Sequence, residues 1–265
     1  MTTITTEQIK ELRDETGISV MQIKKALEEA EGDREKALMV LKKKSGVDAS
    51  KRSERSTKEG LIVIKTEGEK TIVLTLGSET DFVSKNDDFI ALAHSLTDTA
   101  LADGIDAMRE HAPDIINPVI QKIGENIQLI DVEIYTTSGD DQLNSYVHSG
   151  KYAVVVVLSG GTPEIGKDVA MHIAAMKPEY IRREDIDEKS KTMAEEMFQK
   201  EVDESDKPAE IKEKMLQGKI DSYFKERTLL DQTFIKNGDQ TVGQLLEHAA
   251  DGPLTIKDFK IYSIG

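Results

Sequence analysis

Apolar residues recur every three or four positions through the first 46 residues, which is the spacing of amphipathic helices. Three short helical stretches are separated at Gly17 and at Glu31–Asp33. Their apolar faces are formed by Ile9 and Leu12, by Val20, Ile23, Leu27 and Ala30, and by Ala37, Leu38 and Leu41. Thr5 and Ser19 each stand three positions before a Gln, the form of a capping box, and mark two helix starts. The pattern predicts a compact three-helix domain over residues 1–46.

The helical spacing is lost in the next segment. Residues 42–58 contain seven Lys/Arg and two acidic residues, with almost no large apolar side chains. This composition is typical of a solvated linker, which we expect over residues 47–59. A basic run could instead touch nucleic acid, but a chain this acidic disfavours that interpretation.

From Gly60 the apolar residues alternate with polar ones, which is the spacing of β-strands. The expected elements are strands over 61–66 and 71–76, helices over about 87–102 and 113–125, and a strand over 127–135. The turn at Glu67–Lys70 joins the first two strands into a hairpin. In the last strand, the alternation predicts that Ile130, Val132 and Ile134 lie on one face. These elements make up the expected core N-subdomain, residues 60–139.

The chain then repeats this plan. Residues 150–158 resemble residues 68–76 in having a turn and an apolar strand placed before a helix, here a helix over about 166–177. Two such units predict a duplicated core, with a C-subdomain over residues 140–265.

Residues 187–226 depart from the repeat. Two charged helical stretches are joined by the short turn Asp203–Asp206, which predicts an antiparallel helical hairpin. The predicted fold class is therefore α+β: a small three-helix N-terminal domain, a linker, and a duplicated α+β core of antiparallel hairpins and packed helices. An antiparallel helical arm is inserted in the C-subdomain.

Charge and composition exclude several classes of function and site. Residues 1–60 carry 13 basic and 12 acidic residues, whereas the other 205 carry 22 and 38, within a net charge of −15. Such a surface repels phosphate backbones, so we expect no direct nucleic-acid binding. The absence of cysteine excludes disulfides and thiolate sites and fits a cytoplasmic location. No apolar run reaches about 18 residues and the start is polar, so neither a membrane span nor a signal peptide is expected. Exposed strand edges leave a homodimer open.

One stretch resembles a nucleotide-binding loop. Residues 161–168 match the phosphate-loop spacing up to the last position, where Asp168 replaces the hydroxyl that would bind Mg²⁺. Pro163 removes a backbone donor, and Glu164 puts a negative charge where phosphates would lie. A helix start is the better interpretation. The five histidines show no metal-binding spacing, and His94 and His172 are expected to be partly buried helix residues. We expect no catalytic residue, cofactor or metal.

The segment between the second strand and the following helix contains an unusual aromatic residue. Phe82 is flanked by Asp81 and Val83 in what the pattern predicts to be a loop. Either it folds back onto Leu76 or Phe89, or it is exposed for a partner. Local sequence favours the fold-back, while the acidic charge and the lack of a catalytic cluster favour a protein partner.

Short motifs in a fixed order extend along nearly the whole chain. They are Glu11–Gly17, Lys24–Leu27, Glu31–Asp33, Thr80–Val83 with Lys85, Lys122–Ile127, Ser145–His148, His172–Ala175 with Lys177 and Pro178, and Thr241–Leu246. In this order they resemble the elongation factor Ts family, the guanine-nucleotide exchange factors of the translational GTPase elongation factor Tu. The resemblance implies a ubiquitin-associated-like N-terminal domain, a duplicated core and a coiled arm.

The same resemblance implies a binding site and a mechanism. In the family, an Asp-Phe pair enters the GTPase domain of elongation factor Tu bound to GDP. The Phe inserts near the nucleotide, the Mg²⁺ site is disturbed and GDP is released. By position, the pair is Asp81 and Phe82, within Thr80, Asp81, Phe82 and Val83. The implied protein is an exchange factor and not an enzyme.

Secondary contacts are also implied. By family position, Val20 and Met21 contact the GTPase domain, and His148 contacts a more distal domain of the partner. Many members have paired methionines where this chain has Ile18–Met21, so only Met21 matches. The sequence ends at Gly265, whereas longer members add a helical tail. The alternative function is a protein-binding adaptor that uses the N-terminal three-helix module.

Overall fold

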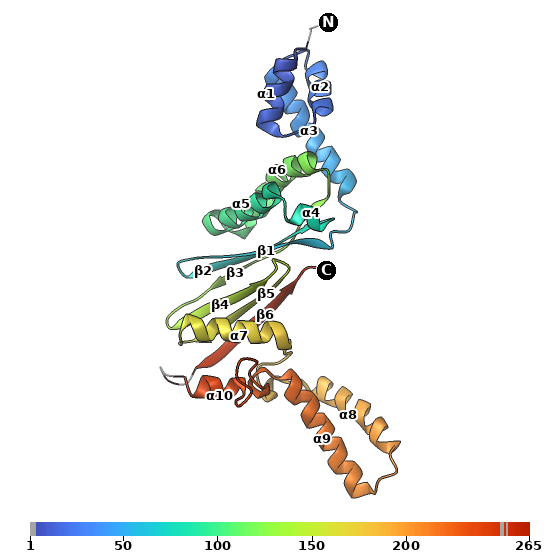
Figure 1. The fold of residues 1–265 in the computed structure, drawn as a ribbon, viewed down its shortest axis with the longest axis vertical. Coiled ribbons are helices and arrows are strands. Elements are labelled where there is room, and N and C mark those ends of the chain that lie inside the picture. Colours follow the sequence, from blue (N-terminus) through green and yellow to red (C-terminus); the bar gives the residue numbers. More distant parts are fainter. Residues whose placement is uncertain (1–3, 250–251, 253) are drawn as a thin grey trace. The chain divides into compact units, whose positions relative to one another are not determined.

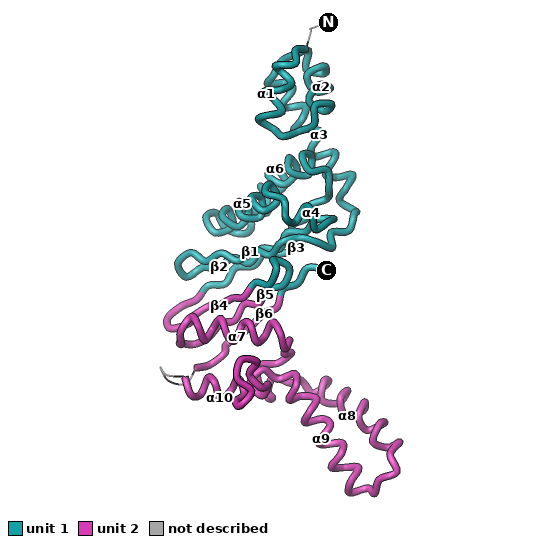
Figure 2. Tube along the Cα trace, viewed as in Figure 1, with its two compact units in different colours: residues 1–136, 147–152, 262–265 teal, residues 137–146, 153–261 magenta. Residues whose placement is uncertain are grey.

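The computed structural model describes residues 4–249, 252 and 254–265. The chain divides into two compact units (Figure 2). Unit 1 comprises residues 1–136, 147–152 and 262–265, and unit 2 comprises residues 137–146 and 153–261. Helices and strands are mixed in the chain, which confirms the predicted α+β class (Figure 1).

Unit 1 begins with three helices, α1 (Thr6–Thr16), α2 (Val20–Glu29) and α3 (Arg34–Arg52). Of the two predicted capping boxes, the one at Thr5 is present, because the Gln8 N–H donates to Thr5 Oγ1 at 3.2 Å and the Thr5 N–H donates to Gln8 Oε1 at 3.0 Å. At Ser19 the Gln22 side chain accepts from the Ser19 hydroxyl instead of from its backbone N–H. The Ser19 and Asp33 side chains cap α2 and α3. Their shared core is formed by Leu12, Ile18, Ile23, Ala26, Leu27, Ala30, Ala37 and Leu41.

The third helix differs from the sequence expectation. It continues to Arg52, so residues 47–52, expected in the linker, are helical. Ser45 is buried and Ala49, one turn further on, packs against the main core of unit 1. Residues four apart lie on one face of a helix, so the basic side chains can remain in water while this face packs. Packing outweighs a composition that is typical of a linker.

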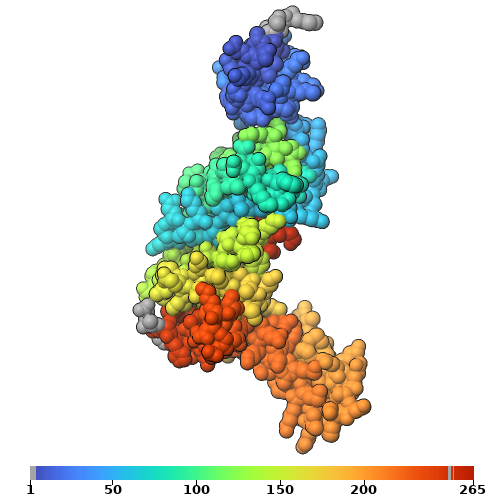
Figure 3. Space-filling view, in the orientation of Figure 1, coloured from blue at the N-terminus to red at the C-terminus, as the bar shows by residue number. Residues whose placement is uncertain are grey.

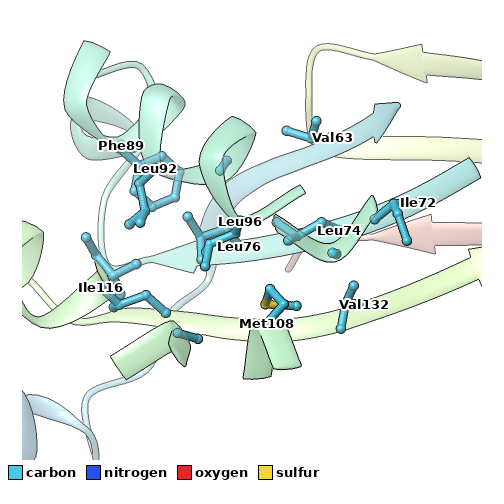
Figure 4. Close-up of a cluster of buried hydrophobic side chains, with 14 of the residues drawn as sticks. Val63, Ile72, Leu74, Leu76, Phe89, Leu92, Leu96, Met108, Ile116 and Val132 are labelled. Atoms are coloured by element: carbon cyan, nitrogen blue, oxygen red, sulfur yellow. The ribbon is translucent and has the colours of Figure 1, made fainter. Parts of the chain in front are cut away.

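The sheet of unit 1 contains β1 (Glu59–Glu67), β2 (Lys70–Ser78) and β3 (Ile127–Thr136), in the order β1-β2-β3 and antiparallel throughout. The predicted hairpin is present, with Glu67 paired to Lys70. The helices α5 (Asp87–Asp103) and α6 (Ile105–Ile123) pack on this sheet. Figure 4 shows part of the resulting core, in which Phe89 and Leu96 of α5 cluster with Leu74 and Leu76 of β2.

Two elements of unit 1 differ from the pattern prediction. Helix α6 starts at Ile105 instead of about Pro113, because Met108 and Ala112 extend its buried face despite the prolines inside it. In β3, a register shift opposite Thr75 and Leu76 interrupts the alternation. Of the three residues expected on one face, only Val132 is buried, and Ile130 and Ile134 are largely exposed. The bulge at Ile130 turns that side chain out of the alternation, whereas Ile134 lies on the same side of the bulge as Val132 and is exposed near the end of β3.

The second sheet contains β4 (Asp141–His148), β5 (Tyr152–Ser159) and β6 (Thr255–Ser263), in the order β4-β5-β6. A hairpin precedes α7 (Pro163–Met176), and the last strand pairs with the second strand of the hairpin, as in the first sheet. The short helix α10 (Val242–Glu247) precedes β6, and single 3-10 turns lie at Arg183–Asp185 and Leu229–Asp231. The common strand order confirms the predicted duplicated core.

The predicted helical arm is formed by α8 (Glu188–Asp203) and α9 (Ala209–Arg227). Its two helices pack against each other and extend from the rest of unit 2, as the orange lobe of Figure 3 shows. Phe198, Tyr223 and Phe224 stack edge to face, and Phe224 is buried near the base of the arm.

Candidate functional site

The segment that contains Phe82 is a single helical turn, α4 (Asp81–Ser84), where the pattern predicted a loop. Val83 is buried in the core of unit 1, whereas Phe82 is 82% exposed. Neighbouring residues of a helix point about 100° apart, so burying one turns the other outward. The fold-back of Phe82 onto Leu76 or Phe89 is therefore wrong. An exposed Phe on an ordered turn is a ready contact for an apolar pocket of a partner.

Asp81 gives this turn a negative charge beside the aromatic ring. Its carboxylate accepts a hydrogen bond from Lys85 Nζ at 2.8 Å, one helical turn further on. That hydrogen bond and the charge of Lys85 lower the pKa of Asp81 below its ordinary value, with a smaller contribution from Lys151. Asp81 is thus ionised at neutral pH. The turn presents an apolar ring and an anion next to each other.

Thr80 fixes the start of the turn. Its backbone N–H donates to Glu125 Oε2 at 3.0 Å and its hydroxyl donates to Glu125 Oε1 at 2.8 Å. The hydroxyl therefore makes no capping bond to α4. The Thr80 carbonyl accepts from the Ser78 hydroxyl at 3.0 Å. Both ends of the Thr80 backbone are held by groups outside α4.

A second carboxylate, that of Glu79, links the same two segments of the chain. Glu125 reaches from the segment after α6 to Thr80, and Glu79 reaches from the segment before α4 to Asn126. Glu79 accepts from the backbone N–H of Asn126 at 2.6 Å and forms an ion pair with Arg55 at 3.2 Å. Asn126 is 1% exposed and donates from its amide to the Arg55 carbonyl at 2.8 Å. Sequence reasoning gave Glu79, Glu125 and Asn126 no role, although the last two lie in the motif Lys122–Ile127. Only the fold shows that they meet the Thr80 segment.

The positions implied as secondary contacts are exposed. Val20 is 45% exposed and Met21 is 69% exposed, directly after the cap of α2 at Ser19. They lie outside the three-helix core because the buried face of α2 is formed by Ile23, Ala26 and Leu27. Two large apolar side chains without cover at a helix start fit a contact surface.

His148 is exposed and begins the turn between β4 and β5. Its carbonyl accepts from the Lys151 N–H at 3.1 Å, and Ser149 and Gly150 have positive φ angles of 52° and 72°. These angles are those of a type I′ hairpin turn. Lys151 pairs with Glu59 and adds to the charge field on Asp81, so this turn lies within electrostatic range of α4 in unit 1.

The other candidates have structural roles. In the glycine-rich stretch, Thr162 caps α7 and Pro163 is its first residue, as expected for a helix start. His172 is fully buried, with its Nε2 atom 2.9 Å from Gln232 Oε1, and burial lowers the pKa of its imidazole. His94, which is expected to be partly buried, is exposed in the structure. Among the described residues, no three His, Cys, Asp or Glu side chains are grouped as metal ligands. No described helix is long and apolar enough to cross a membrane.

Comparison with known proteins identifies relatives of the chain. A family model described as elongation factor TS matches residues 79–265. The elongation factor Ts of Nitrosospira multiformis is 38% identical over 278 aligned positions, which cover all of this chain and 91% of the relative. The elongation factor Ts of Hahella chejuensis is 37% identical over 256 positions, which cover 94% of this chain and 88% of the relative.

Proposed function

This chain belongs to the elongation factor Ts family of translation elongation factors, and we propose that it is a guanine-nucleotide exchange factor for elongation factor Tu. The observation that carries the proposal is the exposed Phe82 beside ionised Asp81 on an anchored turn. These residues occupy the positions that the family resemblance assigns to the contact with the GTPase. Exchange makes and breaks no covalent bond, so the chain needs no catalytic residue and no cofactor for it.

The turn acts as a wedge on the partner. Phe82 leaves water and enters an apolar space near the nucleotide of the GTPase, while Val83 keeps the turn attached to the core of unit 1. Mg²⁺ requires near-ideal octahedral geometry and bridges the phosphates to protein oxygens in GTPases. A small displacement of its surroundings weakens retention of GDP.

Thermodynamic linkage sets the differential binding free energy that the contacts of α4 and of the other sites must supply. If the factor binds nucleotide-free elongation factor Tu more tightly than the GDP form, it must lower the affinity for GDP by the same factor. Each tenfold loss of GDP affinity requires about 1.4 kcal/mol of differential binding. Burial of one Phe side chain contributes roughly 1.5–3 kcal/mol, so Phe82 alone accounts for one or two factors of ten.

Further contacts must therefore share the task. Val20 and Met21 supply exposed apolar area on the three-helix part of unit 1. His148 lies at the tip of an exposed hairpin in the same unit. We assign these three residues to secondary contacts with elongation factor Tu. Within the segment Thr80–Val83, Asp81 and Phe82 make the primary contact, while Thr80 and the buried Val83 hold the turn in place.

Stopped-flow release of a fluorescent GDP analogue from elongation factor Tu tests the proposed function. Addition of the chain is expected to accelerate release, with a rate that rises with its concentration and saturates. Binding to elongation factor Tu without acceleration would contradict the exchange function and would instead favour the adaptor alternative. Bovine serum albumin at equal concentration serves as the control for nonspecific protein effects.

A further inference from the structure

The turn that carries Phe82 is too short to hold its own shape. The helix α4 has four residues, and the backbone bond from the Ser84 N–H to the Thr80 carbonyl is long at 3.3 Å. The Ser84 hydroxyl and Lys85 add local bonds to Asp81. Helices shorter than about 12 residues are marginal in water without tertiary support. The conformation of α4 must therefore be imposed by contacts with the rest of unit 1.

Three contacts of this kind involve Thr80 and Val83 in the described part of the chain. Val83 is buried in the core, the Ser78 hydroxyl holds the Thr80 carbonyl, and Glu125 holds both the N–H and the hydroxyl of Thr80. The contact with Glu125 is the only one of the three that fixes two donors of one residue with one side chain. Hydrogen bonds to an ionised acceptor are shorter and stronger than neutral ones, and a two-point contact also fixes orientation.

Glu125 is itself held in place. It comes directly after Gly124, which ends α6 with a φ of 90°, and directly before Asn126, whose N–H is bound by Glu79. The segments 79–80 and 125–126 thus exchange carboxylate contacts in both directions. This pair of contacts, here called the Glu79–Glu125 clamp, leaves the Thr80 end of α4 little freedom to rotate.

We propose that Glu125 is a positioning residue for nucleotide exchange, an inference that rests on the exchange function proposed above. By fixing Thr80 at two points, Glu125 sets the direction in which the Phe82 side chain projects from the surface of unit 1. Ordering a flexible side chain or loop on binding weakens an interaction, and preorganisation avoids that loss. Glu125 acts through the turn and makes no contact with the nucleotide.

The test compares Glu125→Ala with Glu110→Ala, the same substitution at an exposed glutamate of α6 for which no hydrogen bond or ion pair is seen in the described part of the chain. GDP release from elongation factor Tu is measured at saturating factor. Glu125→Ala is expected to slow release by about tenfold, which corresponds to about 1.4 kcal/mol of activation free energy. Glu110→Ala should behave as the wild type. Equal rates for the two variants would overturn the positioning role.

A double-mutant cycle with Phe82→Ala separates positioning from general destabilisation. If Glu125 acts by aiming Phe82, Glu125→Ala should slow release by less than about twofold once Phe82 is gone, because the two effects are coupled. An undiminished tenfold effect in the Phe82→Ala background would overturn the inference. A wild type that fails to accelerate release refutes the proposed function itself, which is a different result.

Two milder variants keep the test valid if Glu125→Ala does not fold. In Glu125→Gln, the carbonyl can accept from the Thr80 N–H while the amide donates to the Thr80 hydroxyl, so release should stay within about threefold of the wild type. Thr80→Val removes one of the two bonds and should slow release more than Glu125→Gln does. The reverse order would overturn the two-point contact as the cause.

Discussion

Replacing Phe82 by alanine is expected to slow the GDP release that this chain stimulates by about tenfold or more, with little change in its melting temperature. The reason is that Phe82 is 82% exposed, so its removal leaves no cavity in unit 1. Its ring gains burial only in the complex, where roughly 1.5–3 kcal/mol of differential binding is lost with it. Stopped-flow release and circular dichroism melting are measured on the same preparation.

Met193→Ala is the matched control for this variant. Met193 is 61% exposed on the helical arm, so its truncation also removes exposed apolar area without disturbing a core. It should leave both release and melting near those of the wild type. A Phe82→Ala variant that stimulates release at the wild-type rate would remove Phe82 from the mechanism. A large drop in its melting temperature would contradict the exposed position.

The Phe89→Ala variant is expected to lose about 3–5 kcal/mol of unfolding free energy, the usual cost of removing a buried aromatic side chain. Phe89 lies seven positions after Phe82 and is fully buried in the core of unit 1 (Figure 4). Its removal leaves a cavity beneath α5. Urea unfolding followed by circular dichroism should show a lower midpoint with a similar slope for the transition of unit 1.

Phe82→Ala provides the control for Phe89→Ala in the same experiment. The chemical change is identical and only the burial differs, so any difference in the unfolding midpoint reports packing. Equal midpoints for the two variants would contradict the core arrangement in unit 1. Loss of exchange activity in Phe89→Ala would follow from unfolding, whereas the loss in Phe82→Ala should occur in a folded chain.

The elements that the sequence predicts well are those defined by local signals. The capping box at Thr5 and Gln8, the hairpin turn at Glu67–Lys70 and the repeated hairpin-plus-helix plan all depend on residues near each other in the chain. Caps and turns are satisfied by neighbours, so their chemistry is visible before the fold is known. These features appear in the structure as expected.

The elements that were missed depend on tertiary packing. The extension of α3 to Arg52 requires a surface for Ala49 to pack on, and the early start of α6 requires a core for Met108. The register shift in β3 near Ile130 arises from pairing with β2. Neither composition nor periodicity contains these partners, because they come from distant parts of the chain.

In the candidate site, too, some features follow from the sequence and others depend on tertiary packing. Resemblance to a family identifies Thr80–Val83 as the site, whereas the local pattern alone favours a folded-back Phe82. The direction of Phe82 is decided by the burial of Val83 and by the bond pair between Thr80 and Glu125, which are 45 positions apart. Such a contact has no signature in a single sequence.

We infer that this chain binds elongation factor Tu in competition with GDP. The most direct test is calorimetric titration of the chain into nucleotide-free and into GDP-loaded elongation factor Tu. Reciprocity requires that the ratio of the two affinities equal the factor by which the chain lowers the affinity for GDP. We expect tighter binding to the nucleotide-free form by at least about tenfold, or about 1.4 kcal/mol. Equal affinities for the two forms would contradict it.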